Sequence, residues 1–452
     1  MKVGKIMFNK RDFYNEMFKV ALPITFQSLF QSSVSVIDQV MVGQLGSTSI
    51  TGAGLGGKFS SLFTVTVSAV ATGAGILIAQ YYGNKSRQGV NNSFISNLYF
   101  SLIIGVFFTI ISMTLPVQIM SLYSADPAAV NEASSYLRIV AVGFIPMTLT
   151  LMISTLLRCI GQAKYPMWAS IASVILNTVL NYILIFGKLS FPAMGLQGAA
   201  YSTDIARITE FILVLILLLR AIRNKDLYVS FHTELNLEFI KKVFMVLYPI
   251  LICEFLWSLG ENGYAVIYGR IGTDACAAMT LTNPIQSLMI GLFSGIAAAA
   301  GIITGKALGD DRYDDAYIMA KKMIKIGIVG SILLAVIFSS CASLYVDIFS
   351  VNNSIKQDTV YILYVFSIML FIKVSNMILG GGVLRSGGRT IIIMFIDMIG
   401  TWMFGIPLGI MAAFIFNLPI YAVYFILSLE ELVRLLISLA VFKKKIWMKN
   451  IT

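Results

Sequence analysis

Apolar residues in this chain gather in twelve long runs, separated by shorter polar connections. Each run is long enough to cross a hydrocarbon layer of about 30 Å, because an α-helix rises about 1.5 Å per residue. The period-two alternation of a membrane β-barrel is absent, so helices are the expected way to satisfy the backbone in lipid. The predicted spans are 17–42, 53–81, 93–117, 134–157, 166–187, 196–219, 243–268, 277–305, 324–346, 359–382, 391–413 and 418–442.

The second half of the chain repeats the first. A shift of 226 residues places Pro23 on Pro249 and Gly83 on Gly309, and a shift of 227 places Arg158 on Arg385. Such a long period is typical of transporter folds built from two parallel repeats. The pattern predicts an all-α integral membrane protein with twelve transmembrane helices in two pseudo-symmetric six-helix lobes around a central cavity. We expect the lobes at 1–219 and 243–452, the second with a basic tail, and a cytoplasmic linker at 220–242.

Composition and charge narrow the function. The chain is 58% hydrophobic and 12% charged, whereas a soluble domain carries about 25% charged residues. Twenty-four of the 33 Lys and Arg residues lie in the two tails and in the connections on the same side of the membrane as the tails. The net charge of +11 is therefore explained by the orientation of the chain in the membrane, and no nucleic-acid partner is expected. The positive-inside rule predicts cytoplasmic termini in a cell inner or plasma membrane, in contact with membrane lipid.

Asp38 is the clearest ionisable residue inside a predicted span. The segment QSSVSVIDQVMVG holds no basic residue within two turns of it, and burial without a partner disfavours the charged carboxylate. Asn177 and Asn181 lie four residues apart, on one face of the fifth span. The three side chains are candidates for an ion-coupling site that takes Na⁺ or a proton. The alternatives are hydrogen bonding for packing alone, a pairing of Asp38 with Lys58, and asparagines that only hold helices together.

The second half offers different chemistry, because Tyr264 stands where the repeat aligns Asp38. Its deep polar groups could bind organic cations or shuttle protons, or the acids could pair with Lys373. Glu254 and Glu261 are seven residues apart and share one face of the seventh span. The candidates for a substrate or second-lobe site are Glu254, Glu261, Lys373, Asn376 and Asp397.

Several segments together resemble the multidrug and toxic compound extrusion (MATE) family along nearly the whole chain. They include ALPITFQSLFQSSVSVIDQVMVGQLG, LLRCIGQAKYP and LNTVLNYILIFG, in this order. The resemblance implies a V-shaped central cavity and export of organic cations in exchange for Na⁺ or H⁺. Within it, Asp38 matches the family's first-helix cation-site acid, and Asn177 and Asn181 match its fifth-helix partners. Some members carry a second acid where Asn181 stands, and the seventh-helix acid of other members falls near Trp257.

We therefore expect secondary active multidrug efflux of small cationic or amphipathic molecules by a monomer without a cofactor. An enzyme is not expected, because no nucleophile, base or metal constellation lies at a membrane face. Two alternatives stay open. A lipid-linked oligosaccharide flippase of the same superfamily would line its cavity with several Arg or Lys to meet a pyrophosphate. A facilitator of the major facilitator type would carry a basic signature between the second and third helices, which GNKSRQG matches poorly.

Overall fold

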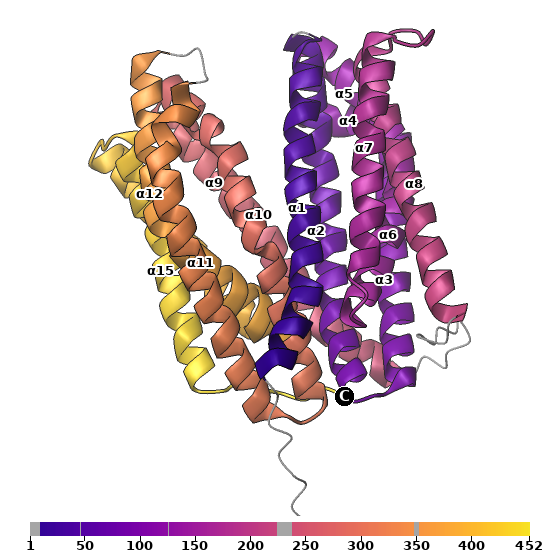
Figure 1. The fold of residues 1–452 in the computed structure, drawn as a ribbon. Helices are drawn as coiled ribbons and strands as arrows, with labels where there is room; N and C mark the ends of the chain where they lie inside the picture. Colours follow the sequence, from indigo (N-terminus) through magenta and orange to yellow (C-terminus); the bar gives the residue numbers. More distant parts are fainter. Residues whose placement is uncertain (1–9, 46, 125, 224–236, 348–351) are drawn as a thin grey trace, which may run out of the picture. The chain divides into compact units, whose positions relative to one another are not determined.

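The computed structural model describes residues 10–45, 47–124, 126–223, 237–347 and 352–452, which form helices and no strand (Figure 1). The first-half helices are α1 (Lys10–Gly43), α2 (Ser47–Gly83), α3 (Arg87–Thr114), α4 (Pro116–Ser121), α5 (Pro127–Val140), the short η1 (Ala141–Gly143), α6 (Phe144–Cys159), α7 (Lys164–Phe186) and α8 (Gly195–Arg223). The second-half helices are α9 (Leu237–Ile271), α10 (Thr273–Gly309), α11 (Tyr313–Asp347), α12 (Asn353–Asn376), η2 (Met377–Leu384), α13 (Thr390–Met398), η3 (Ile399–Gly405), α14 (Ile406–Ile410), η4 (Met411–Ile415) and α15 (Ile420–Lys443).

Each predicted span corresponds to one long helix or to one run of consecutive helical pieces, which confirms the all-α membrane architecture. Within the described residues, ten helices are long and apolar enough to cross a membrane. The other two predicted spans are α8 and α15. They occupy equivalent places in the two repeats, and both carry several ionisable side chains: Asp204, Arg207 and Glu210 on α8, and Glu430, Glu431 and Arg434 on α15.

Helix breaks occur where the local sequence favours them. Ser86 caps α3, because its side chain accepts a hydrogen bond from the Gly89 amide at 3.1 Å. Asp126 caps α5 in the same way, and Pro127 follows at the first helical position, where its missing N–H costs nothing. The tenth span changes from α12 to the π-helical η2 at Met377, and η2 contains three glycines in a row, Gly380–Gly382. Such π segments are frequent at functional sites.

The chain divides into two compact units, which we call the first-half unit (Phe26–Ile78 and Ser86–Leu247) and the second-half unit (Met1–Thr25, Ala79–Lys85 and Tyr248–Thr452). This division differs from the predicted lobe boundaries, because residues 1–25 and 79–85 group with the second half. The predicted linker at 220–242 falls largely outside the described residues, which stop at Arg223 and resume at Leu237.

Aromatic packing forms the core of the first-half unit. Phe63 of α2 stacks on Phe144 of α6 with 4.2 Å between ring centroids, and both side chains are fully buried. Val67, Leu137 and Ala200 extend this core to α5 and α8. The cluster therefore holds four helices of the unit together by burying apolar area.

Segment 444–452 is packed into the second-half unit. Trp447 is only 1% exposed and stacks on Phe442 at 5.8 Å. Gln80, at the end of α2, is completely buried and forms two hydrogen bonds with this segment. Its Nε2 donates to the Lys449 carbonyl at 3.1 Å, and its Oε1 accepts from the Ile451 amide at 2.8 Å. The same Nε2 donates to the Ser386 carbonyl at 2.7 Å. These bonds explain why the end of α2 groups with the second half.

The ends of α2 and α10 cross through two glycines that are equivalent in the repeat. A Cβ at Gly83 would overlap the backbone carbonyl of Lys306, and a Cβ at Gly309 would overlap that of Gln80. Lys306 is itself the repeat equivalent of Gln80, because both pairs are related by the shift of 226. The crossing is thus reciprocal, and it requires glycine on both helices.

The crossing predicts that Gly83→Ala destabilises the protein. The added methyl group must push two backbones apart, which for overpacking costs about 1–3 kcal/mol. Gly54→Ala on the same helix is the matched control, because its Cβ would meet nothing within 4 Å. That change is expected to be neutral or to stabilise by up to about 1 kcal/mol, since Ala is the better helix former. Thermal melts of both purified variants in detergent test the difference, and equal melting temperatures would contradict it.

Candidate functional site

The first-half unit joins all three predicted ion-coupling residues. Asn181 Nδ2 of α7 donates to Asp38 Oδ1 of α1 at 2.7 Å, and it also lies 3.3 Å from Asn177 Oδ1. Asn177 and Asn181 are buried, with 8% and 2% of their surfaces exposed. Their spacing of four residues places them one turn apart on the face of α7 that meets Asp38. The predicted constellation is therefore a contiguous polar site.

Neighbouring contacts hold α7 in position. Ser173 Oγ donates to the Ala206 carbonyl of α8 at 2.8 Å, one turn before Asn177. Gln31 Nε2 of α1 donates to Ser170 Oγ of α7 at 3.1 Å. These bonds tie α7 to the helices on either side of it. Asn177 and Asn181 therefore lie on a helix whose position is fixed by hydrogen bonds to two neighbouring helices.

Asp38 has amide neighbours and no cationic partner in the part of the chain that the structure describes. No Lys or Arg of those residues lies within ion-pair distance, so the alternative pairing with Lys58 is not formed. The side-chain NH₂ group of Asn181 donates to Asp38 and to Asn177. The side-chain carbonyl oxygen of Asn181 is buried and accepts no hydrogen bond from the described residues. A buried, unsatisfied oxygen beside a carboxyl is unusual in a native structure. Carboxylate and carbonyl oxygens are the donors that a small hard cation prefers.

Sequence reasoning missed a second polar cluster in the first-half unit. Arg158 donates to Gln27 Oε1 at 2.7 Å, which joins the end of α6 to α1. Glu210 of α8 belongs to the same cluster, because its charge acts on Arg158. The side chains of Gln27 and Gln31 are four residues apart on α1, so they share a face. This spacing was the available signal, and it marks the side of α1 that faces polar neighbours.

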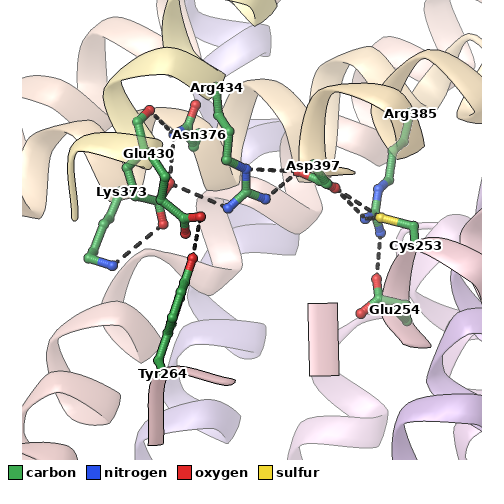
Figure 2. A network of polar contacts seen from close by, with 10 residues as sticks. Cys253, Glu254, Tyr264, Lys373, Asn376, Arg385, Asp397, Glu430 and Arg434 are labelled. Atoms are coloured by element: carbon green, nitrogen blue, oxygen red, sulfur yellow. Dashed lines mark hydrogen bonds and ion pairs between the residues drawn. The ribbon is translucent and has the colours of Figure 1, made fainter. Parts of the chain in front are cut away.

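The second-half unit contains a larger network of opposite charges, shown in Figure 2. The guanidinium group of Arg434 of α15 donates through both Nε and Nη2 to Asp397 Oδ1 of α13, with the Nε contact at 2.9 Å. Cys253 Sγ donates to the other carboxylate oxygen at 2.9 Å. Arg385 lies 4.0 Å from Asp397 and 3.0 Å from Glu254. Two arginines therefore neutralise two of the predicted acids, Glu254 and Asp397.

Lys373 takes a partner that the sequence did not indicate. Its Nζ lies 3.4 Å from Glu431, whereas Glu254, Glu261 and Asp397 were the acids considered for it. Asn376 Nδ2 donates to Glu431 Oε2 at 2.7 Å and to the Glu431 backbone carbonyl at the same distance. The pairing of Glu431 with Arg434 along α15, at 3.7 Å, is part of the same network.

A cavity of about 650 Å³ opens beside this network within the second-half unit. Its lining includes the backbone of η2, so the π-helical turn borders the cavity. Aromatic side chains form one part of the wall, namely Trp257, Tyr264, Tyr268 and Tyr424. The charged lining residues are Glu261, Asp397, Glu430, Glu431, Lys373, Arg385 and Arg434.

Two carboxyl groups of the lining form no ion pair with a Lys or Arg of the described residues. Glu261 makes no hydrogen bond or ion pair with the residues described by the structure, and its side chain is exposed to the cavity. Glu430 is buried at 6% exposure and accepts a hydrogen bond from the Tyr264 hydroxyl. Glu430 was not among the predicted residues, although it sits next to Glu431. Glu254 does not line the cavity.

Comparison with known proteins shows the extent of the similarity. The family model MatE matches residues 23–183 and 249–411, which are the two repeats. The probable multidrug resistance protein YoeA of Bacillus subtilis (strain 168) is 24% identical over 434 residues, covering 92% of this chain and 90% of the relative. The probable multidrug resistance protein NorM of Halalkalibacterium halodurans is 25% identical over 403 residues, covering 87% of this chain and 86% of the relative.

Solved structures share the fold. A crystal structure of MATE in complex with MaL6 is 21% identical, with a TM-score of 0.88 over 96% of both chains. An outward-facing multidrug resistance MATE family transporter of the MOP superfamily is 20% identical, with a TM-score of 0.88 over 95% of both chains. At such identities the likeness establishes the fold, and the role of each residue has to be argued from this chain.

The charge network predicts that Arg434→Met is strongly destabilising. The change leaves Asp397 and Glu431 short of a cation in a buried setting, which for a broken buried pair costs about 3–5 kcal/mol. Arg270→Met, at an exposed position on the last turn of α9, should change stability by less than about 0.5 kcal/mol. Thermal melts measure both. The double variant Arg434→Met with Asp397→Leu should recover part of the loss, and strict additivity of the two changes would contradict the pairing.

Proposed function

The chain belongs to the MatE family of transporters, and we propose that it exports organic cations and cationic amphiphiles by antiport with Na⁺ or H⁺. The first-half unit supplies the ion-coupling site at Asp38, Asn177 and Asn181. The second-half unit supplies a cavity for the substrate. The multidrug resistance relatives support this class of substrate.

The observation that carries the proposal is the bonding of Asp38. Its carboxyl group is held by a neutral amide at 2.7 Å, with no cation in ion-pair distance among the described residues. A carboxyl that is already paired with Arg or Lys has little to gain from a transported ion. A carboxyl bound only by amides gains a full charge interaction, so it can alternate between a protonated or Na⁺-bound form and a free form.

Na⁺ is a suitable alternative to the proton at this site. The Asp38 carboxyl and the carbonyl oxygens of Asn177 and Asn181 together supply hard oxygen donors. The Asn181 oxygen is buried and unsatisfied, so an ion there would meet a group that now lacks a partner. Protonation of Asp38 would serve the same coupling role by removing the charge of the carboxyl.

Coupling then follows from differential binding. The ion must bind one conformation more tightly than the other, because a ligand with equal affinity for both shifts no equilibrium. In the proposed cycle, ion binding at Asp38 favours the conformation that releases substrate outside. Substrate loading from the inside favours loss of the ion.

The charges of the second-half cavity support a cationic substrate over a pyrophosphate-linked lipid. A flippase of the alternative class needs free Arg or Lys side chains to meet the phosphates. Here Lys373, Arg385 and Arg434 are each within 4.0 Å of a carboxylate. The cations are therefore already neutralised, while carboxyl groups remain in excess.

We also propose the orientation and assembly that the sequence suggests. Both ends of the chain lie in the cytoplasm, because the Lys and Arg residues concentrate on that side. The protein is placed in the cell inner or plasma membrane and acts as a monomer, without a cofactor.

The proposal predicts that Asp38→Asn abolishes ethidium transport. The amide retains the size of the side chain and cannot take up a charge, so the ion loses its counter-charge. Transport is measured as ethidium movement in vesicles, driven in separate runs by a Na⁺ gradient and by a pH gradient. Asp314→Asn is the matched control, because that carboxylate is 83% exposed and its removal should leave transport unchanged.

Correct folding of the Asp38→Asn variant is checked by a single symmetrical gel-filtration peak in detergent. Full ethidium transport by a folded Asp38→Asn variant under both gradients would overturn the assignment. Drive by the Na⁺ gradient alone, or by the pH gradient alone, identifies the coupling ion.

A further inference from the structure

We propose that Glu261 and Lys373 set the number of positive charges that the second-half cavity accepts, and that the cavity favours organic cations with two positive charges over those with one. The inference rests on the proposed export of organic cations and adds a charge specificity to it.

The charged residues around the cavity are more often acidic than basic. Four lining residues are acids, namely Glu261, Asp397, Glu430 and Glu431, and three are bases, namely Lys373, Arg385 and Arg434. Arg385 is shared with a further acid outside the lining, because it pairs with Glu254 at 3.0 Å. Lys373 and Arg434 therefore compensate two of the four lining carboxyls, and Arg385 adds only part of its charge because Glu254 shares it. Close to two negative charges of the lining remain uncompensated.

The excess is localised. Asp397 is held by Arg434, and Glu431 is held by Lys373 at 3.4 Å and by Arg434 at 3.7 Å. Glu430 accepts from the Tyr264 hydroxyl, which is a neutral donor. Glu261 forms no hydrogen bond or ion pair with any described residue, although the positive charges of Lys373 and Arg434 act on it from a longer distance. Within the described residues, Glu261 and Glu430 are thus the two lining carboxyls that form no ion pair, and they are the ones available to a ligand.

The walls around these two acids suit a flat organic cation. Tyr264 and Tyr268 come from the same helix as Glu261, three and seven residues further on, and Trp257 lies four residues before it; all line the cavity. Aromatic faces attract cations in addition to providing apolar area. A cavity of about 650 Å³ falls within the range of about 300–1,000 Å³ that is typical of small-molecule sites.

Lys373 acts as a built-in competitor for the substrate. Its ammonium group lines the same cavity and neutralises Glu431. Without this side chain Glu431 would keep only Arg434 as a cationic neighbour, which it shares with Asp397, so the cavity would carry one more uncompensated negative charge. With Lys373 present the available charge stays near two, and anions are disfavoured because each described cation of the lining is paired with a carboxylate. Lys373 therefore defines the upper limit of ligand charge, and Glu261 supplies the second negative charge.

Ethidium and propidium test the inference because they share one phenanthridinium ring system. Ethidium carries one positive charge, and propidium carries a second one on a quaternary ammonium arm. Their binding to the full-length purified protein is measured by fluorescence polarisation. We expect propidium to bind about tenfold more tightly than ethidium, since one further charge contact in a partly buried site is worth about that much. Added salt should reduce this ratio.

Two variants should move the affinity ratio in opposite directions. Glu261→Gln removes one carboxylate and should bring the propidium to ethidium ratio close to one. Lys373→Met removes one positive charge beside Glu431 and should raise the ratio by about another tenfold. A side chain with a purely structural role would weaken both dyes together and leave the ratio unchanged. Asp314→Asn is the control that should keep the wild-type ratio, because Asp314 is exposed in the first turn of α11 and does not line the cavity.

The outcomes separate this inference from the proposed function. Equal affinity of the wild-type protein for both dyes overturns the charge specificity and leaves export of organic cations standing. Binding of neither dye overturns both. Loss of the ratio in Asp38→Asn, with the ratio intact in Glu261→Gln, would place the charge selection at the ion site and overturn the role of Glu261.

Discussion

The need to compensate buried charge governs this structure more than any other constraint. An uncompensated ion at the centre of a bilayer costs about 2.5–3.5 kcal/mol on insertion scales, and the second-half unit holds many ionisable side chains. Arg434 meets this need by bonding Asp397 of α13 and Glu431 of its own helix. Arg385 adds Glu254 of α9. The network thereby fixes the mutual arrangement of four helical pieces, and the cavity is what remains between them.

The two repeats use equivalent positions for different chemistry. Arg158 and Arg385 correspond in the repeat, yet the first bonds the neutral Gln27 and the second bonds an acid. A shift of 227 also relates Ser170 to Asp397, a hydroxyl in one half and a carboxylate in the other. Among its described residues, the first-half unit thus offers Asp38 no Lys or Arg at ion-pair distance. The second-half unit pairs Glu254, Asp397 and Glu431 with arginine or lysine. A common scaffold therefore supports an ion site in one unit and a ligand cavity in the other.

Sequence reasoning recovered what depends on periodicity and missed what depends on tertiary contacts. The helical spans followed from apolar runs, and the spacing of four residues placed Asn177 and Asn181 on one helical face. Their association with Asp38 was implied by the resemblance to the MATE family and not by the spacing. The partner of Lys373 was not anticipated, since Glu431 is 58 residues away and nothing local marks it. Glu430 was missed because adjacent residues on a helix point in different directions, and only the fold shows that both reach one cavity.

The longest-range contacts were equally hidden. Gln80 bonds a segment 371 residues further along the chain, and its glutamine side chain looks like an ordinary helix-end residue in the sequence. The repeat of glycines at positions 83 and 309 was visible, but its reason was not. Only the fold shows that both positions require glycine because the backbones of α2 and α10 are in contact there.

That glycine crossing has a consequence for the origin of the chain. Gly83 rests on Lys306 while Gly309 rests on Gln80, so each repeat contributes the same two positions to both sides of the contact. This is the isologous geometry of a twofold homodimer. A half-length ancestor with one such glycine would already have carried a complete, self-complementary dimer contact, and fusion of two copies would have preserved it without any new interface.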